Sequence, residues 1–126
     1  MRYYGRFAVS SLAVVCLIAL VAAAETEDKT NPYTGDTEAI AQGAKLYKRF
    51  NCYACHGMAG GGGMGPSISD DDWKEGSGSD ASLMRQLMEG RAAMPPFAGI
   101  IGEDDAWKVI AFVRTLYKGD PAKVTW

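Results

Sequence analysis

Two cysteines and one histidine lie close together in the run Cys52-Tyr53-Ala54-Cys55-His56. The spacing C-x-x-C-H is typical of covalent attachment of a c-type haem. Each thiol can bond to one vinyl group of a single porphyrin, and a histidine directly after the second cysteine reaches the iron beneath the ring. The run therefore predicts one covalently bound haem c, held by Cys52 and Cys55 and ligated by His56.

Two other interpretations of the cysteine pair find less support. A redox-active C-x-x-C pair belongs to a fold with a βαβ pattern, and the sequence shows no such pattern. A zinc site needs further cysteine or histidine ligands, but His56 is the only histidine of the chain. Haem attachment remains the prediction that uses all three residues.

Residues 1–24 have the pattern of a secretory signal peptide. Arg2 and Arg6 give a positive start, residues 7–23 are predominantly apolar, and residues 22–24 form an Ala-Ala-Ala cleavage site. A retained membrane anchor is the alternative, but about 17 apolar residues are at the short end for spanning a bilayer. We expect an exported, periplasmic protein without stable membrane insertion, which loses Cys16 together with the signal.

The remaining chain is acidic. Removal of residues 1–24 takes away two arginines and no acidic residue, which leaves 11 basic and 15 acidic residues and a formal net charge of −4. This balance disfavours nucleic acid or anionic membranes as partners and favours a docking partner with basic residues. A modest negative charge is also an ordinary means of staying soluble.

The chain after the signal carries helical patterns and no alternating strand pattern. Residues 25–35 are polar and are predicted to form a flexible or irregular arm. A first helix is expected to begin with Asp36 or Thr37 as N-cap and to run directly into Cys52.

Two further helices follow. The second begins at Ser79 or Asp80 and ends before Gly90, and the third begins after Gly102 and ends at Gly119. The sequence therefore predicts an all-α fold with three main helices and long loops around one haem. Residues 36–119 form the domain, and residues 120–126 are a C-terminal tail.

Residues 57–66 are rich in glycine and are predicted to form a loop, because each glycine costs a helix about 1 kcal/mol relative to alanine. The glycines could let the backbone pass close to a flat cofactor, or the loop could simply be exposed and flexible. A phosphate-binding loop is excluded, because no Gly-Lys-Ser/Thr ending, preceding strand or following helix is present.

Met94 is the predicted second axial ligand of the iron. The two prolines that follow it favour an extended, stiff backbone that can aim the thioether, a soft ligand suited to haem iron. Met58 is too close to His56 to reach the opposite side of the ring easily, Met64 lies among flexible glycines, and a vacant or water-filled position is a further alternative. Met84 and Met88 lie on a helical stripe and are expected to pack in the core.

These elements, in their order and spacing, resemble a small class I cytochrome c over roughly residues 36–119. The resemblance rests on the haem motif after a helix with Gly43 and Tyr47, on Gly65-Pro66, on Met94-Pro95 and on the apolar helix of residues 109–113. It implies that Gly43 lies at a close helix crossing, facing the region of Val109 and Phe112. It also implies that the carbonyl of Pro66 accepts a hydrogen bond from His56.

Two further side chains are candidates for contact with the haem, Trp73 through the same resemblance and Arg91 through its position three residues before Met94. Trp73 could donate its indole N–H to a haem propionate or serve in packing alone. Arg91 could neutralise a propionate or be a solvated arginine.

A finer resemblance concerns the partner. Residues 31–35, the loop of residues 60–66, Asp72-Trp73 and residues 120–126 are similar to cytochromes that accept electrons from periplasmic PQQ-dependent alcohol dehydrogenases, including methanol dehydrogenases. This implies a monomeric one-electron carrier, not an enzyme, that passes electrons from such a dehydrogenase to another cytochrome or an oxidase in the respiratory chain. A haem enzyme or gas sensor with a labile sixth ligand, and a cytochrome subunit of a larger membrane complex, are the alternatives.

Overall fold

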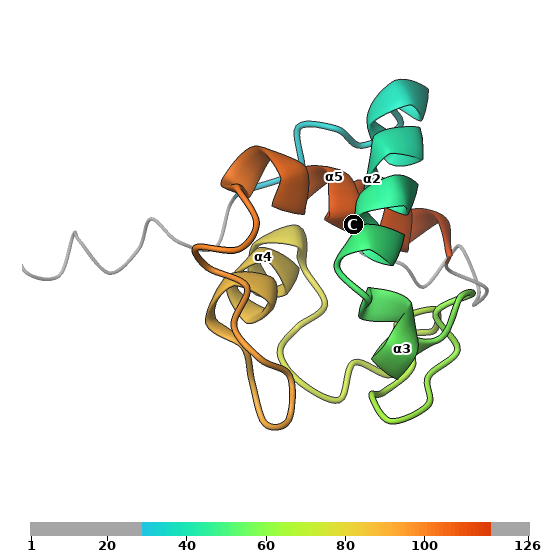
Figure 1. The fold of residues 1–126 in the computed structure, drawn as a ribbon, viewed down its shortest axis with the longest axis vertical. Coiled ribbons are helices and arrows are strands. Elements are labelled where there is room, and N and C mark those ends of the chain that lie inside the picture. Colours follow the sequence, from blue (N-terminus) through green and yellow to red (C-terminus); the bar gives the residue numbers. More distant parts are fainter. Residues whose placement is uncertain (1–28, 117–126) are drawn as a thin grey trace, which may run out of the picture.

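A computed structural model describes residues 29–116 and contains four helices in this range. They are α2 (Thr37–Arg49), α3 (Cys52–His56), α4 (Asp80–Glu89) and α5 (Glu103–Thr115), shown in Figure 1. The described residues form two isolated β-bridges and no strand. The predicted all-α fold is confirmed, with a short fourth helix added to the three long ones. The predicted signal peptide and C-terminal tail lie outside the described residues.

Helix α2 begins where the sequence predicts. The side chain of Asp36 accepts hydrogen bonds from the backbone N–H groups of Glu38 and Ala39, which identifies Asp36 as the N-cap. Its buried residues Ala39, Gly43 and Tyr47 recur every four positions, so one face of the helix is turned inward.

That face crosses α5 at close range, as Figure 1 shows. A Cβ atom at Gly43 would overlap the carbonyl group of Lys108 and lie 3.0 Å from the Cβ of Phe112. The rings of Tyr47 and Phe112 meet edge to face, with centroids 5.3 Å apart. The expected helix crossing at Gly43 is confirmed, with Lys108 and Phe112 as its contacts on α5.

The connection between α2 and the haem motif differs from the prediction of one continuous helix. Helix α2 ends at Arg49, and Asn51 adopts a left-handed conformation with φ of 58° before α3 begins at Cys52. Asparagine tolerates this conformation better than most residues, so it can interrupt the helix. The haem motif therefore occupies a short helix of its own, which does not continue the axis of α2.

Helices α4 and α5 also begin as predicted. The hydroxyl of Ser79 accepts a hydrogen bond from the N–H of Ser82, and α4 ends at Glu89 before Gly90. Helix α5 begins after Gly102 but ends at Thr115, earlier than the predicted end at Gly119, which lies outside the described residues.

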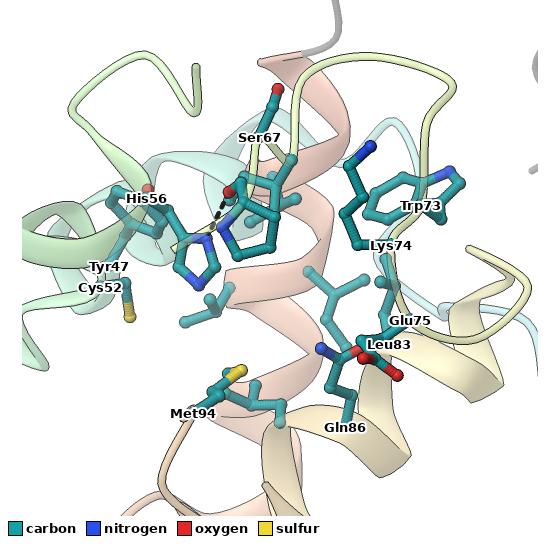
Figure 2. Close-up of a pocket in the computed structure, with 16 residues that line it drawn as sticks. Tyr47, Cys52, His56, Ser67, Trp73, Lys74, Glu75, Leu83, Gln86 and Met94 are labelled. Carbon is teal, nitrogen blue, oxygen red and sulfur yellow. Dashed lines mark hydrogen bonds between the residues drawn. The ribbon is translucent and has the colours of Figure 1, made fainter. Parts of the chain in front are cut away.

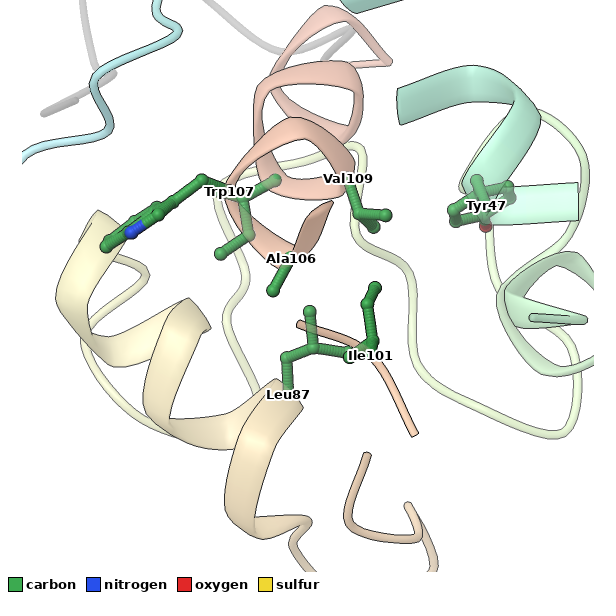
Figure 3. Packing of buried hydrophobic residues seen from close by; sticks show 7 residues of the cluster. Tyr47, Leu87, Ile101, Ala106, Trp107 and Val109 are labelled. Atoms are coloured by element: carbon green, nitrogen blue, oxygen red, sulfur yellow. The ribbon is translucent and has the colours of Figure 1, made fainter. Parts of the chain in front are cut away.

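The core lies where α4 and the loop before α5 meet α5. Figure 3 shows Leu87 and Ile101 beneath Ala106 and Val109 of α5. Met84 and Met88, expected in the core, are partly buried and pack against this cluster. The amphipathic pattern of α4 therefore serves packing.

The described part of the segment before α2, residues 29–36, has the irregular backbone that was one of the two expectations, and it is docked on the domain. Asn31 is buried, its backbone N–H donates to Asp80 (2.8 Å), and its side-chain amide donates to the carbonyl of Trp107 (2.9 Å). Asp80 also pairs with Arg114 at 2.6 Å. These contacts join the segment to both α4 and α5.

Candidate functional site

An apolar cavity lies between the four helices and the loops that connect them. It contains about 670 Å³ of space without atoms, part of which is open to solvent. The predicted site residues Cys52, His56, Trp73 and Met94 line it together, as Figure 2 shows, and Pro66 is a further lining residue. Cys55 and Arg91 do not line it.

The imidazole of His56 is held by one hydrogen bond. Its Nδ1 lies 2.9 Å from the carbonyl oxygen of Pro66, and because a carbonyl only accepts, Nδ1 carries the proton. The other ring nitrogen, Nε2, keeps its lone pair and points into the cavity in Figure 2. The contact with Pro66 therefore prepares His56 as a metal ligand with a fixed ring orientation.

The glycine-rich loop wraps around the haem motif. Backbone N–H groups of Gly62 and Gly65 donate to the carbonyls of His56 (2.8 Å) and Cys55 (2.9 Å). A Cβ atom at Gly65 would lie 3.0 Å from Cε1 of His56, whereas a Cβ atom at Gly61 would meet nothing within 4 Å. Some of the glycines thus serve a close approach to the motif, and Gly61 faces open space.

Tyr47 contacts the residue that follows the haem motif. Its hydroxyl donates to the carbonyl of Gly57 (2.8 Å), directly after His56, and its ring lines the cavity. Burial raises the pKa of Tyr47 from 10.0 to about 12. In the sequence, Tyr47 stood out only through its place in the resemblance to class I cytochromes c, which did not reveal the bond to Gly57.

The Met94 side chain faces His56 across the cavity in Figure 2. Its backbone exchanges two hydrogen bonds with Arg91, at 3.1 and 2.9 Å. Of the competing methionines, Met58 is 55% exposed and Met64 is 84% exposed, and neither lines the cavity. The geometry favours Met94 among the three as the second ligand.

Trp73 and Arg91 have partners within the protein. The Trp73 indole lines the cavity, packs on Gly78 and lies 5.8 Å from the guanidinium of Arg114. Arg91 pairs with Glu75 at 2.5 Å, and Glu75 lines the cavity. Their suggested contacts with haem propionates stay predictions.

The donor set fits a covalently bound haem. The thiol of Cys52 is half-buried at the cavity wall, and burial raises its pKa. Cys55 is also half-buried and in no disulfide, so both thiols are free to form thioethers. Two thiols at this spacing, together with an imidazole nitrogen and a thioether that line an apolar cavity, are the groups by which proteins hold one haem c.

Comparisons with known proteins are consistent with a haem-binding site of this kind. A family model described as cytochrome C oxidase, cbb3-type, subunit III, matches residues 38–113. The cbb3-type cytochrome c oxidase subunit FixP of Rhizobium etli is 37% identical over 86 residues, which are 60% of this chain and 29% of FixP. The chain therefore spans about three tenths of the length of that relative.

For two shorter relatives, the match with this chain covers a larger share of the relative's own length. Cytochrome c6 of Leptolyngbya boryana is 31% identical over 88 residues, which are 68% of this chain and 96% of that protein. The crystal structure of cytochrome cL from the marine methylotrophic bacterium Methylophaga aminisulfidivorans superimposes with a TM-score of 0.67 and 32% identity, covering 71% of this chain and 63% of that one. The chain belongs to the class I c-type cytochromes that bind one haem c, in the family described as cbb3-type cytochrome c oxidase subunit III.

Proposed function

We propose that the protein is a periplasmic carrier of single electrons with His56 and Met94 as the two axial ligands. One observation carries this proposal: the imidazole of His56 and the thioether of Met94 face one another across an apolar cavity. The bound haem supplies the chemistry, because its iron alternates between the ferric and ferrous states.

Residues of this chain hold the two ligands in place and form the surroundings in which the haem would exchange electrons. Pro66 fixes the His56 ring, and the Arg91 backbone fixes the turn that carries Met94. Two ligands held in place in both redox states would keep the structural change small, and the largely apolar walls would limit contact of the haem with water. A His/Met pair raises the reduction potential. The arrangement supports transfer of electrons without making or breaking bonds to a substrate.

The donor we propose is a PQQ-dependent alcohol dehydrogenase, such as a methanol dehydrogenase. Support comes from the sequence resemblance at residues 31–35 and 60–66 and from the structural likeness to cytochrome cL of a methylotrophic bacterium. The electrons would then pass to another cytochrome or an oxidase.

The likeness to FixP favours a second candidate, a cytochrome subunit of an oxidase complex. Among residues 29–116, no helix is long and apolar enough to cross a membrane. The signal peptide pattern of residues 1–24 supports export to the periplasm. The two candidates differ in the direct partner and share the redox step.

The partner is tested by mixing ferric holoprotein with a purified methanol dehydrogenase and methanol, and timing haem reduction at low and high salt. We expect reduction that slows as salt is raised, because screening weakens attraction between complementary charges. An absence of reduction, combined with rapid electron transfer to a cbb3-type oxidase within an isolated complex, would favour the oxidase subunit.

A haem enzyme or gas sensor requires an open or labile sixth position. The chain has no second histidine for distal acid–base chemistry. Carbon monoxide added to the ferrous holoprotein at neutral pH should leave the spectrum unchanged. A rapid spectral shift would favour the enzyme or sensor.

A further inference from the structure

Two loops that line the haem cavity are joined by one ion pair. The first loop, residues 67–79, contributes Trp73, Lys74 and Glu75 to the cavity wall, and the second, the Met94 loop of residues 90–98, contributes Met94. The Nε atom of Arg91 lies 2.5 Å from a carboxylate oxygen of Glu75. The pair therefore connects the Met94 loop to a separate segment of the wall.

Arg91 is tied directly to Met94 through the backbone. Its N–H donates to the carbonyl of Met94, and the N–H of Met94 donates to the carbonyl of Arg91. Such a reciprocal pair closes a tight turn, in which Ala92 has a φ of 50°. A displacement of the Arg91 backbone therefore also moves the backbone of Met94.

The rest of the Met94 loop is anchored on α4. The N–H of Phe97 donates to the carbonyl of Leu87 at 3.1 Å. Gly90, with a φ of 72°, leaves so little room that a Cβ atom would lie 2.6 Å from the carbonyl oxygen of Met94. The bond from Phe97 to Leu87 and the bond from the N–H of Ala98 to the carbonyl of Met88 (3.0 Å) fix the loop on α4, whereas the ion pair fixes it toward the 67–79 loop.

We propose that Glu75 and Arg91 form a latch between two loops of the cavity wall that keeps Met94 in its ligating position and external ligands away from the iron. Both are positioning residues, because they act through the turn that carries Met94. This inference rests on the proposed ligation by Met94. It gives Arg91 a role other than neutralising a propionate.

The latch is expected to contribute modestly. The side chains of Arg91 and Glu75 are 62% and 35% exposed, so water screens their attraction. Because the backbone turn and the α4 anchors remain, the loss of the ion pair should increase transient opening of the Met94 loop without unfolding the domain. Opening is measurable as the rate at which imidazole, a neutral ligand, replaces Met94 in the ferric holoprotein.

The test compares Glu75→Gln, Arg91→Gln and the double variant. We expect each single variant to bind imidazole about two- to fivefold faster than wild type, and the double variant to be no faster than the singles. The two substitutions change the net charge in opposite directions, so an equal acceleration cannot arise from net charge. Asp72→Asn is the matched control, because Asp72 lies in the same loop and pairs with the neighbouring Lys74 instead.

Two different results would contradict the inference. If the wild-type ferric protein shows the Met–iron charge-transfer band and all variants bind imidazole at the wild-type rate, the latch is wrong and the ligation stands. An acceleration by Asp72→Asn equal to that of Glu75→Gln also overturns the latch. If wild type lacks the band and binds imidazole without delay, the ligation fails and the latch fails with it.

Discussion

At the scale of residues, hydrogen bonds to backbone groups position the two proposed axial ligands. The carbonyl of Pro66 orients His56, and the turn closed by Arg91 orients Met94. Backbone contacts of this kind do not depend on the cofactor for their geometry. The protein therefore holds both ligands in place on either side of a cavity that suits a flat, apolar group.

Replacement of Met94 tests the second ligand. Met94→Ala should abolish the Met–iron charge-transfer band near the red end of the ferric spectrum and lower the midpoint potential by on the order of 0.1 V, because a His/Met pair raises the potential. Absorption spectroscopy and redox titration measure both effects. Met64→Ala, which removes a methionine that is 84% exposed, should change neither. An unchanged spectrum in Met94→Ala would exclude Met94 as the ligand.

The buried hydroxyl of Tyr47 makes stability depend on pH in the alkaline range. Its pKa of about 12 lies above the ordinary value of 10.0, so between these pH values the unfolded chain ionises while the folded protein keeps the proton. The contribution of the protonated Tyr47 hydroxyl to the free energy of unfolding is therefore fully present below pH 10 and is lost as the pH rises toward 12.

Tyr47→Phe removes this dependence. At pH 8 the variant should be less stable than wild type by about 1–2 kcal/mol, because the carbonyl of Gly57 loses its partner, and the difference should shrink between pH 10 and 12. Guanidinium unfolding of the ferric holoproteins measures it. Tyr53→Phe, at an exposed tyrosine, is the control. A stability difference that stays constant with pH contradicts the role of Tyr47.

The sequence indicates the residues whose roles depend on local spacing. Cys52, Cys55 and His56 form a contiguous motif, and the prolines after Met94 constrain the backbone beside it. The partners Glu75 and Arg91 lie on separate loops without periodicity, so no local pattern reveals that they meet. Neither does the sequence reveal that Asp80 is buried, because an acidic residue in a first helical turn is ordinarily exposed to solvent.

At the scale of elements, the crossing of α2 and α5 supports the motif that follows α2. Gly43 permits this approach, since a larger residue would collide with the backbone of Lys108. The sequence predicted the crossing through its resemblance to class I cytochromes. It missed the break at Asn51, because the apolar spacing up to Phe50 continues toward Cys52 and a single left-handed residue leaves no periodic signal.

Gly43→Ala tests the crossing. A methyl group that overlaps the carbonyl of Lys108 should force the helices apart and destabilise the holoprotein by about 1–3 kcal/mol. Guanidinium unfolding measures the change. Gly61→Ala adds the same methyl group where nothing lies within 4 Å, and it should leave the midpoint nearly unchanged. Equal midpoints for the two variants would show that the crossing tolerates a side chain.

At the scale of the whole molecule, a buried network unites segments that are distant in sequence. Asp80 at the start of α4 accepts hydrogen bonds from the Asn31 backbone and from Arg114 of α5. Arg114 in turn donates to the carbonyl of Gly78 and lies over Trp73. The segment before α2, the cavity wall and two helices are therefore coupled through one carboxylate.

Asp80→Ala should destabilise the protein strongly. It leaves the guanidinium of Arg114, whose side chain is 11% exposed, without its carboxylate, and breaking a buried pair costs about 3–5 kcal/mol. The Lys29–Glu103 pair is exposed, and Glu103→Ala should have little effect because water screens it. Thermal and guanidinium unfolding compare the two variants. A similar small loss in both would contradict the coupling role of Asp80.

The central claim is that one haem c is closed by His56 and Met94 and exchanges single electrons. Potentiometric titration of the wild-type holoprotein, followed by absorption spectroscopy, tests it most directly. We predict a single one-electron transition, with the Met–iron charge-transfer band present in the ferric form and lost in step with reduction. A ferric form without that band, or a transition that does not fit one electron, would contradict the claim.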